Sequence, residues 1–473
     1  MTIRMIGWVC FLLLGLTGCA SVNLSAGFPA VSAAVEERSA ATLVWNRGTE
    51  LDREAAERLR SLLQKKLTAD DAVQIAMLNN RDLQAVYSEL GIAQADLVQA
   101  GLFRNPVLDA AVLFPLSGIR PDLQFSVVIG FLDALYVPLR KRVAAAQFEE
   151  AKLRVTGAVL DFAAQVRAAF YVHQANEQLL ELRQTIVRAL AASFDVSRRL
   201  HEAGNITDLD LARDRAVMEG SKLALRSGEI NVRQSREQLN SLMGAWGGDL
   251  EWVIDPRLPD LPTEPLQVNG IERVALTRSI DLSHARQRII VAGQLLGYDR
   301  AIALIPSMDV GVGAEREPEE GWRVGPSIAI PIPLFDQGQA RIGRAAAELR
   351  RAQQEYYALA VRIRATVRAA QDRTLGTQDR ALYYRDILLP LRERIVNETQ
   401  LQYNAMQVGI FQLLREREQQ IETGVAYVEA LREYWLARAD LAQIVSGRLP
   451  LSNGFRVDGM RGKSRIKEGA NGD

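Results

Sequence analysis

The stretch VAAAQFEEAKLRVTGAVLDFAAQVRAAFYVHQANEQLLELRQTIVRALAASFDVSRRL (residues 143–200) contains no proline and a single glycine, Gly157. A second run, residues 344–407, is interrupted only by Gly376 and Pro390. At a rise of 1.5 Å per residue, each run predicts a helix about 85–95 Å long, far above the average for globular domains. These two runs decide the fold class, which we predict to be mainly α.

A stripe of small and apolar residues follows each of these runs at helical spacing. Such a stripe, with charged residues around it, is typical of helices that pack side by side. A long coiled coil is the alternative, and it would account for each helix taken alone. It would not account for the strands that we predict between the helices. The stripe residues are Ala164, Ala168, Tyr171, Ala175, Leu179, Leu182, Ile186 and Leu190 in the first run, and Leu349, Ala352, Tyr356, Leu359, Ile363 and Val367 in the second.

Each long helix is predicted to end at a glycine and to be followed at once by another helix. Gly204 and Gly409 stand at these breaks, where glycine can adopt the positive φ that ends a helix. Thr207 is expected to cap the next helix, with Asp210 as its capping-box partner. Each pair of helices therefore folds back as an antiparallel hairpin, and the two breaks are expected to form one tip.

Two segments, residues 107–130 and 307–331, alternate between apolar and polar residues instead. A period of two with one apolar face predicts strands, two in each segment. Each strand is about eight to ten residues long, near the length that crosses a bilayer when the strand is tilted. The alternative interpretation is a small soluble hairpin packed on the helices.

The membrane interpretation predicts an oligomer. Only closed barrels are stable in lipid, because an open sheet edge leaves backbone groups unpaired. Four strands per chain cannot close, and two chains would give about eight strands, a barrel filled by its own side chains. An open pore therefore needs at least three chains, about twelve strands, with Asp109, Gln124, Asp309 and Arg323 expected to face its lumen.

Four pairs of similar segments occur in the same order in the two halves of the chain, which predicts an internal two-fold repeat. The predicted first repeat covers residues 67–254 and the second covers residues 266–447, joined by a proline-rich linker over residues 255–265. The pairs are Ala69–Tyr87 with Val268–Arg286, Asn105–Val112 with Ile305–Val312, Arg142–Ala151 with Arg344–Ala352, and Ala203–Asp214 with Val408–Gln419.

The chain begins with a predicted lipoprotein signal peptide over residues 1–18. Arg4 precedes an apolar stretch of about a dozen residues, which is too short for a membrane span. Leu-Thr-Gly-Cys follows and resembles the bacterial lipobox, so we expect lipidation at Cys19; an ordinary secretory signal with an incidental cysteine is the alternative. An N-terminal extension over residues 19–66 precedes the first repeat, and a disordered tail is expected over residues 448–473.

Composition argues against several functional classes. The 57 basic and 57 acidic residues give a net charge of zero, so no overall field attracts nucleic acid. Both cysteines lie in the leader, and the three histidines, His173, His201 and His284, lack the spacing of a metal site. With no phosphate-binding loop or nucleophile motif, we predict that the chain is not an enzyme and uses no cofactor or metal.

Taken in order, these features resemble the outer-membrane efflux protein family, whose type member is TolC. The resemblance rests on the lipobox, the repeat, LTADDAVQIAMLNNRDLQ (residues 67–84), PIPLFD (residues 331–336) and the helices broken at glycine. It implies a homotrimer with a twelve-stranded β-barrel in the bacterial outer membrane, lipid-anchored, above a long α-helical barrel in the periplasm. It also implies partners, namely a periplasmic adaptor protein and an inner-membrane pump of RND or ABC type, for which the channel is the exit duct for drugs, metals or polypeptides.

The same resemblance implies that the helical tip is a periplasmic entrance held closed by polar contacts. Ile206-Thr207-Asp208 resembles the tip motif of the family, so Asp208 is the expected constriction residue. Arg415 and Glu418 stand where the type member has acidic residues, which predicts a mixed ring of charges; a solvated charged face is the alternative. The alternative function is a periplasmic coiled-coil lipoprotein, an adaptor or envelope scaffold without a pore.

Overall fold

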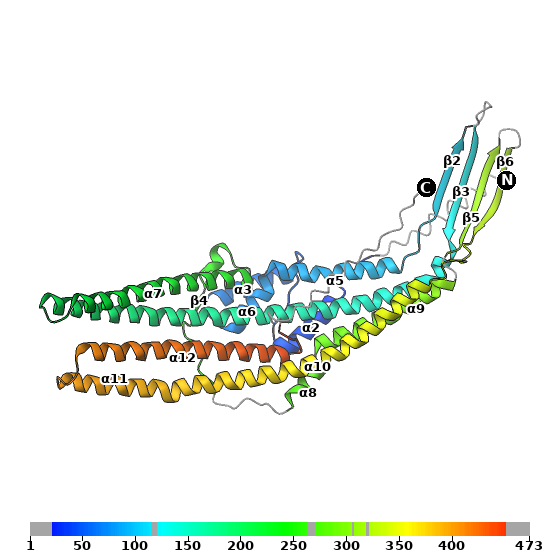
Figure 1. The fold of residues 1–473 in the computed structure, drawn as a ribbon. Coiled ribbons are helices and arrows are strands. Elements are labelled where there is room, and N and C mark those ends of the chain that lie inside the picture. The colour runs from blue at the N-terminus through cyan, green and yellow to red at the C-terminus, as the bar shows by residue number, and fades with distance from the viewer. Residues whose placement is uncertain (1–20, 115–120, 263–269, 305–306, 318–320, 451–473) are drawn as a thin grey trace.

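The computed structural model describes residues 21–450, apart from residues 115–120, 263–269, 305–306 and 318–320. The molecule is elongated, with helices along most of its length and four strands together at one end (Figure 1). The predicted signal peptide and Cys19 lie outside the described residues. No described helix is both long enough and apolar enough to cross a bilayer.

The described elements occur in a similar order in the two halves of the chain. Each half contains a pair of helices followed directly by two strands, a very long helical segment and a helix that returns antiparallel to it; the first half has two further helices and a short strand before this unit. The first half contains α2 (Phe28–Ser39), α3 (Glu50–Leu63), β1 (Lys66–Leu67), α4 (Ala69–Asn79), α5 (Arg81–Ala100), β2 (Val107–Leu113), β3 (Asp122–Gly130), α6 (Phe131–Glu202), α7 (Asp208–Met243), a 3₁₀ turn (Gly247–Leu250) and β4 (Val253–Ile254). The second contains α8 (Ile271–Arg278), α9 (Ile280–Leu304), β5 (Asp309–Glu317), β6 (Gly321–Ala329), α10 (Gln339–Tyr383), a π-helical turn (Tyr384–Leu388), α11 (Leu389–Asn404) and α12 (Ile410–Val445).

The first long helix, α6, is longer than predicted. It has 72 residues and begins at Phe131 rather than Val143, with Pro138 inside it. Proline removes one helical hydrogen bond, which is why sequence pattern alone favours a later start. Tertiary contacts hold this part of the helix in place, since Arg140 Nε donates to the carbonyl oxygen of Ala100 at the end of α5, at 2.9 Å.

The second long helical segment runs from Gln339 to Asn404 and also starts earlier than predicted. Its π-helical turn, Tyr384–Leu388, ends two residues before Pro390. A proline cannot donate to the carbonyl one turn earlier, and a π turn is one way for a helix to accommodate such a change.

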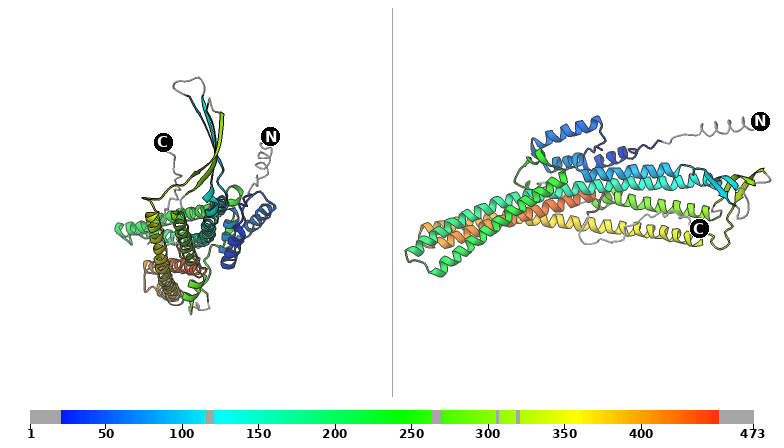
Figure 2. Two further views of the ribbon diagram at one scale, coloured as in Figure 1. Left: turned by 90° about the vertical axis from the view of Figure 1, so that its right-hand side faces the viewer. Right: turned by 90° about the horizontal axis from the view of Figure 1, so that it is seen from above.

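The four strands form one antiparallel sheet in the order β2-β3-β5-β6. The sheet rises away from the ends of α5, α6 and α9 and is not packed on the helices (Figure 2). Every residue of β6 is exposed. The predicted soluble hairpin packed on helices is therefore not what the described chain forms.

The register of the sheet confirms the predicted alternation of apolar and polar residues. Directly paired residues share a face, and the pairings place the apolar positions of all four strands on one side. Phe125 and Trp322 lie on this face with ring centroids 6.1 Å apart. The exposed large residues of the apolar face are Leu108, Val112, Phe125, Val127, Ile129, Val312, Trp322, Val324 and Ile328.

The largest apolar core lies where the N-terminal extension, α4 and α5 pack on the middle of α6. Its members include Val35, Ile75, Tyr87 and Val155, each fully buried. A second core joins α6 to α12 and includes Leu258 and Leu261 of the predicted linker. Gln174 on α6 donates to the linker carbonyl of Asp255 at 2.9 Å, so the described part of the linker is firmly attached to the helices.

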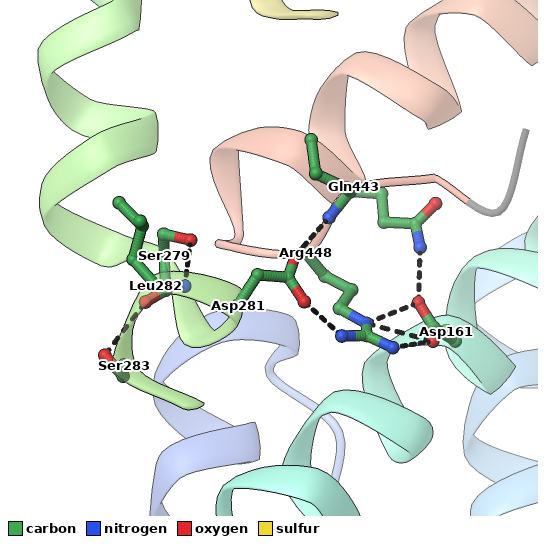
Figure 3. A network of polar contacts seen from close by, with 8 residues as sticks. Asp161, Ser279, Asp281, Leu282, Ser283, Gln443 and Arg448 are labelled. Carbon is green, nitrogen blue, oxygen red and sulfur yellow. Dashed lines mark hydrogen bonds and ion pairs between the residues drawn. The ribbon is translucent and has the colours of Figure 1, made fainter. Parts of the chain in front are cut away.

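The chain after α12 is held by a charged cluster (Figure 3). Arg448 donates to Asp161 on α6, with Nη2 at 2.6 Å from Oδ2, and also to Asp281 near the start of α9. Gln443 donates to Asp161 at 2.9 Å, and the amide of Leu449 donates to Asp281 at 2.8 Å. The prediction that a disordered tail begins at residue 448 is therefore wrong for Arg448 and Leu449; residues 451–473 lie outside the described part of the chain.

Candidate functional site

Two parts of the molecule contain the predicted site residues. The α6–α7 turn and the α11–α12 turn lie together at the end of the molecule opposite the sheet (Figure 1), as predicted for a common tip. The polar face of the sheet is the second part, at the other end.

The α6–α7 turn has the predicted geometry. Gly204 has a φ of +74°, and its amide donates to the carbonyl oxygen of His201 at 2.8 Å. Thr207 caps α7, because its hydroxyl oxygen accepts from the amide of Asp210 at 3.2 Å and donates to the Asp210 carboxylate at 2.7 Å. The Thr207 hydroxyl and the Thr207 backbone amide both donate to the Asp210 carboxylate, and these two bonds hold the pKa of that carboxyl below its usual value.

The α11–α12 turn corrects one prediction. Gly409 is not left-handed: it has a φ of −81° and occupies the N-cap of α12, the place that Thr207 takes before α7. The left-handed residue is Met406, with a φ of +57°, which corresponds to Gly204. Aligning the two glycines therefore shifts the predicted repeat by three residues at the tip.

Glycine alone does not identify the left-handed position, because it is found at both ends of a turn between two helices. Gly is tolerated at an N-cap as well as at the left-handed position after a helix. Met406 accepts the left-handed conformation at a cost of about 1–2 kcal/mol, and its side chain is 94% exposed, so nothing in the described chain obstructs it.

Asp208, the predicted constriction residue, is at the very end of the molecule. Its side chain is 96% exposed, and Oδ1 lies 2.7 Å from Nε2 of His201. Sequence analysis did not predict this pair, since the two residues are brought together only by the turn at Gly204. Because the pair is exposed, it is worth at most about 1 kcal/mol.

Arg415 and Glu418 lie within the first turns of α12 and face different surroundings. Arg415 is exposed, whereas Glu418 is partly buried and lines a small cavity of about 20 Å³ between α12 and α6 with Ile186 and Leu190. Burial raises the pKa of the Glu418 carboxyl, and so does the charge of Glu422, while Arg415 opposes the shift. In the described chain Glu418 is thus part of the seam between two helices and not in contact with Asp208.

The structure brings the four predicted polar residues of the sheet onto one face. Asp109, Gln124, Asp309 and Arg323 all fall on the side opposite the apolar residues. Gln124 Nε2 donates to Oε1 of Glu315, at 3.0 Å. A cavity of about 480 Å³ lies over this face. Among the described residues, no group of three or more His, Cys, Asp and Glu side chains is arranged to hold a metal ion.

Comparison with known proteins identifies relatives of this fold. The chain is 21% identical over 388 residues to the cobalt-zinc-cadmium resistance protein CzcC of Cupriavidus metallidurans, covering 80% of this chain and 90% of that protein. It is 24% identical over 298 residues to the probable efflux pump outer membrane protein TtgC of Pseudomonas putida, covering 57% of this chain and 60% of the relative. No protein-family profile matches the chain.

A solved structure agrees with these relatives. The Campylobacter jejuni CmeC outer membrane channel superposes with a TM-score of 0.65 at 14% identity, covering 88% of this chain and 92% of that one. This likeness shows that the fold is shared. Together with the sequence relatives and the long-helix hairpins below a four-stranded sheet, it leads to one conclusion: the chain is similar in sequence to outer-membrane efflux proteins and shares the fold of an outer-membrane channel.

Proposed function

We propose that this chain is one subunit of a trimeric outer-membrane efflux channel, which conducts substrates received from an inner-membrane pump and a periplasmic adaptor to the cell exterior. The observation that carries the proposal is the sheet. It has an exposed apolar face, an opposite polar face and two outer strands, β2 and β6, that have no further strand partner among the described residues. The names of the relatives describe resistance and efflux and favour this function over a scaffold without a pore.

The lengths of the strands support insertion into a bilayer. The four strands have 7, 9, 9 and 9 residues, close to the roughly 9–11 residues of a tilted membrane strand. Three copies joined from β2 to β6 would form a closed barrel of twelve strands with the polar face inside. We propose that Asp109, Gln124, Asp309 and Arg323 face this lumen, and that the two halves of the chain are copies of one unit.

The helices are proposed to form the periplasmic duct. In each chain α7 and the segment α10–α11 lie at the two edges of the long-helix layer (Figure 1). Exposed apolar residues lie on both edges, among them Leu223 on α7 and Val361 on α10, and copies packed edge to edge would cover them. Lipidation at Cys19 is proposed as a second attachment to the membrane, and the partner pump is proposed to be of RND or ABC type.

The channel function can be tested on the purified lipoprotein. We expect discrete conductance steps in planar bilayers, and an oligomer band on gels that converts on heating to a monomer slightly smaller than the 52.4 kDa of the full chain, because residues 1–18 are proposed to be removed. The protein should be recovered from the outer-membrane fraction. Recovery only from the soluble periplasmic fraction, without conductance, would instead support the adaptor or scaffold.

We further propose that the tip is the entrance and that Asp208, Arg415 and Glu418 help to hold it closed. Changing all three to Asn, Gln and Gln is expected to increase the single-channel conductance, because every subunit loses the charges of Arg415 and Glu418 and the exposed contact of Asp208 with His201, which is worth at most about 1 kcal/mol. The matched control removes the exposed Glu219–Lys222 pair, 3.2 Å apart on α7. Conductance equal to that of the native protein would show that the three residues do not gate.

A further inference from the structure

The register of the sheet divides its polar face into rows of side chains that cross the strands. In one row, Glu315 lies directly between Gln124 on β3 and Arg323 on β6. The Gln124 amide donates to the Glu315 carboxylate at 3.0 Å. The residue paired with Glu315 on the other side is the positively charged Arg323. The negative charge of Glu315 is therefore offset within its own row.

The next row toward the helices is different. Asp109 on β2 is paired with Ser126, which is paired with Gly313 and, beyond it, Gly325. Two of these four positions have no side chain and the third is a hydroxyl. Asp109 thus has the only formal charge in its row, and its side chain is exposed.

The two glycines of this row are not required by packing. A Cβ atom at Gly313 would approach only the carbonyl oxygen of Phe125, at 3.9 Å, and a Cβ at Gly325 would meet nothing within 4 Å. Gly311 is the contrast, since a Cβ there would lie 2.7 Å from the carbonyl oxygen of Val127. Glycine at 313 and 325 therefore keeps space open above the sheet, where the cavity of about 480 Å³ lies beside Asp109.

We propose that Asp109 makes the exit lumen selective for cationic solutes over anionic ones, an inference that rests on the proposed trimeric channel. Closing three copies would place three Asp109 carboxylates at one level of the lumen, above backbone that carries no opposing charge. Rings of acidic side chains favour cations in pores, because a low-dielectric wall concentrates their field in the water between them. Glu315 contributes less, since Gln124 and Arg323 lie on either side of it. Asp309, which is paired with Gly130 and Ala329, also has the only formal charge in its row and adds to the field of Asp109.

The test is the reversal potential of the purified native oligomer in planar bilayers under a KCl gradient. The native channel is expected to favour K⁺ over Cl⁻. Asp109→Asn should reduce the K⁺/Cl⁻ permeability ratio by about twofold or more with the conductance steps retained, and Asp109→Lys should reduce it further. The control is Asp260→Asn, which removes an exposed carboxylate of the linker, outside the sheet, and should leave the ratio unchanged.

Two results would overturn the inference while leaving the channel intact: a native pore that favours Cl⁻, or an Asp109→Asn pore with the native permeability ratio. Absence of any conductance from the native protein would contradict the proposed channel itself, and the inference with it. Oligomer bands on unheated gels verify that each variant has assembled, so a change of ratio is read only from folded protein.

Discussion

Arg448→Ala is expected to destabilise the folded chain by about 3 kcal/mol, because it leaves two carboxylates in a partly buried cluster without their cation. Asp161 and Asp281 keep only 13% and 12% of their side-chain exposure, and Arg448 keeps 25%. The value is placed at the low end of the range for broken buried pairs because water still reaches the guanidinium. The measurement is thermal unfolding in detergent, followed by the loss of helical circular dichroism.

Two further variants separate charge from packing. Arg373→Ala breaks an exposed pair with Asp440, with N and O 3.1 Å apart, and should cost less than about 1 kcal/mol. Combining Arg448→Met with Asp161→Asn and Asp281→Asn removes all three charges together and should recover much of the lost stability. An Arg448→Ala protein that unfolds at the native temperature would show that the cluster does not secure the end of α12.

Val324→Lys is expected to abolish assembly in the outer membrane. Val324 lies on the apolar face near the centre of β6 and is 70% exposed in the single chain. If this face contacts lipid, a lysine near the middle of the bilayer costs about 2–4 kcal/mol in each subunit, or three times that in a trimer. The measurement is the fraction of protein recovered with outer membranes and as an oligomer on unheated gels.

The matched control is the neighbouring residue. Gly325→Lys places the same side chain on the polar face at nearly the same depth, because successive residues of a strand point to opposite sides, and a Cβ at Gly325 meets nothing within 4 Å. This variant should be recovered with outer membranes like the native protein. Equal recovery of both variants would mean that the apolar face does not contact lipid, and it would remove the main support for the barrel.

Several elements were predictable because they depend on residues close together in the sequence. The long helices follow from a period of about 3.6 residues and the near absence of proline, and the Thr207–Asp210 cap follows from a spacing of three. The faces of the sheet follow from strict alternation, which holds whichever strands become neighbours. Asp109, Gln124, Asp309 and Arg323 therefore fall on one face as predicted.

Other features depend on contacts that no local pattern encodes. Arg448 meets Asp281 and Asp161 across 167 and 287 residues of sequence, so it could not be distinguished from an exposed tail residue. His201 pairs with Asp208 only through the turn at Gly204, and Glu418 is partly buried only because α6 packs against α12. The sequence pattern placed the left-handed residue of the second turn at Gly409, whereas in the structure it is Met406, three residues earlier.

The sequence by itself determined which segments are helix or strand and which side of each is apolar, because those properties are set by neighbours a few residues away. Only the tertiary structure decided the strand order β2-β3-β5-β6, the α6–α12 seam that partly buries Glu418 and the cluster that fixes Arg448. These depend on which distant segments meet, and the free energy of that choice comes from the packing of whole helices against one another.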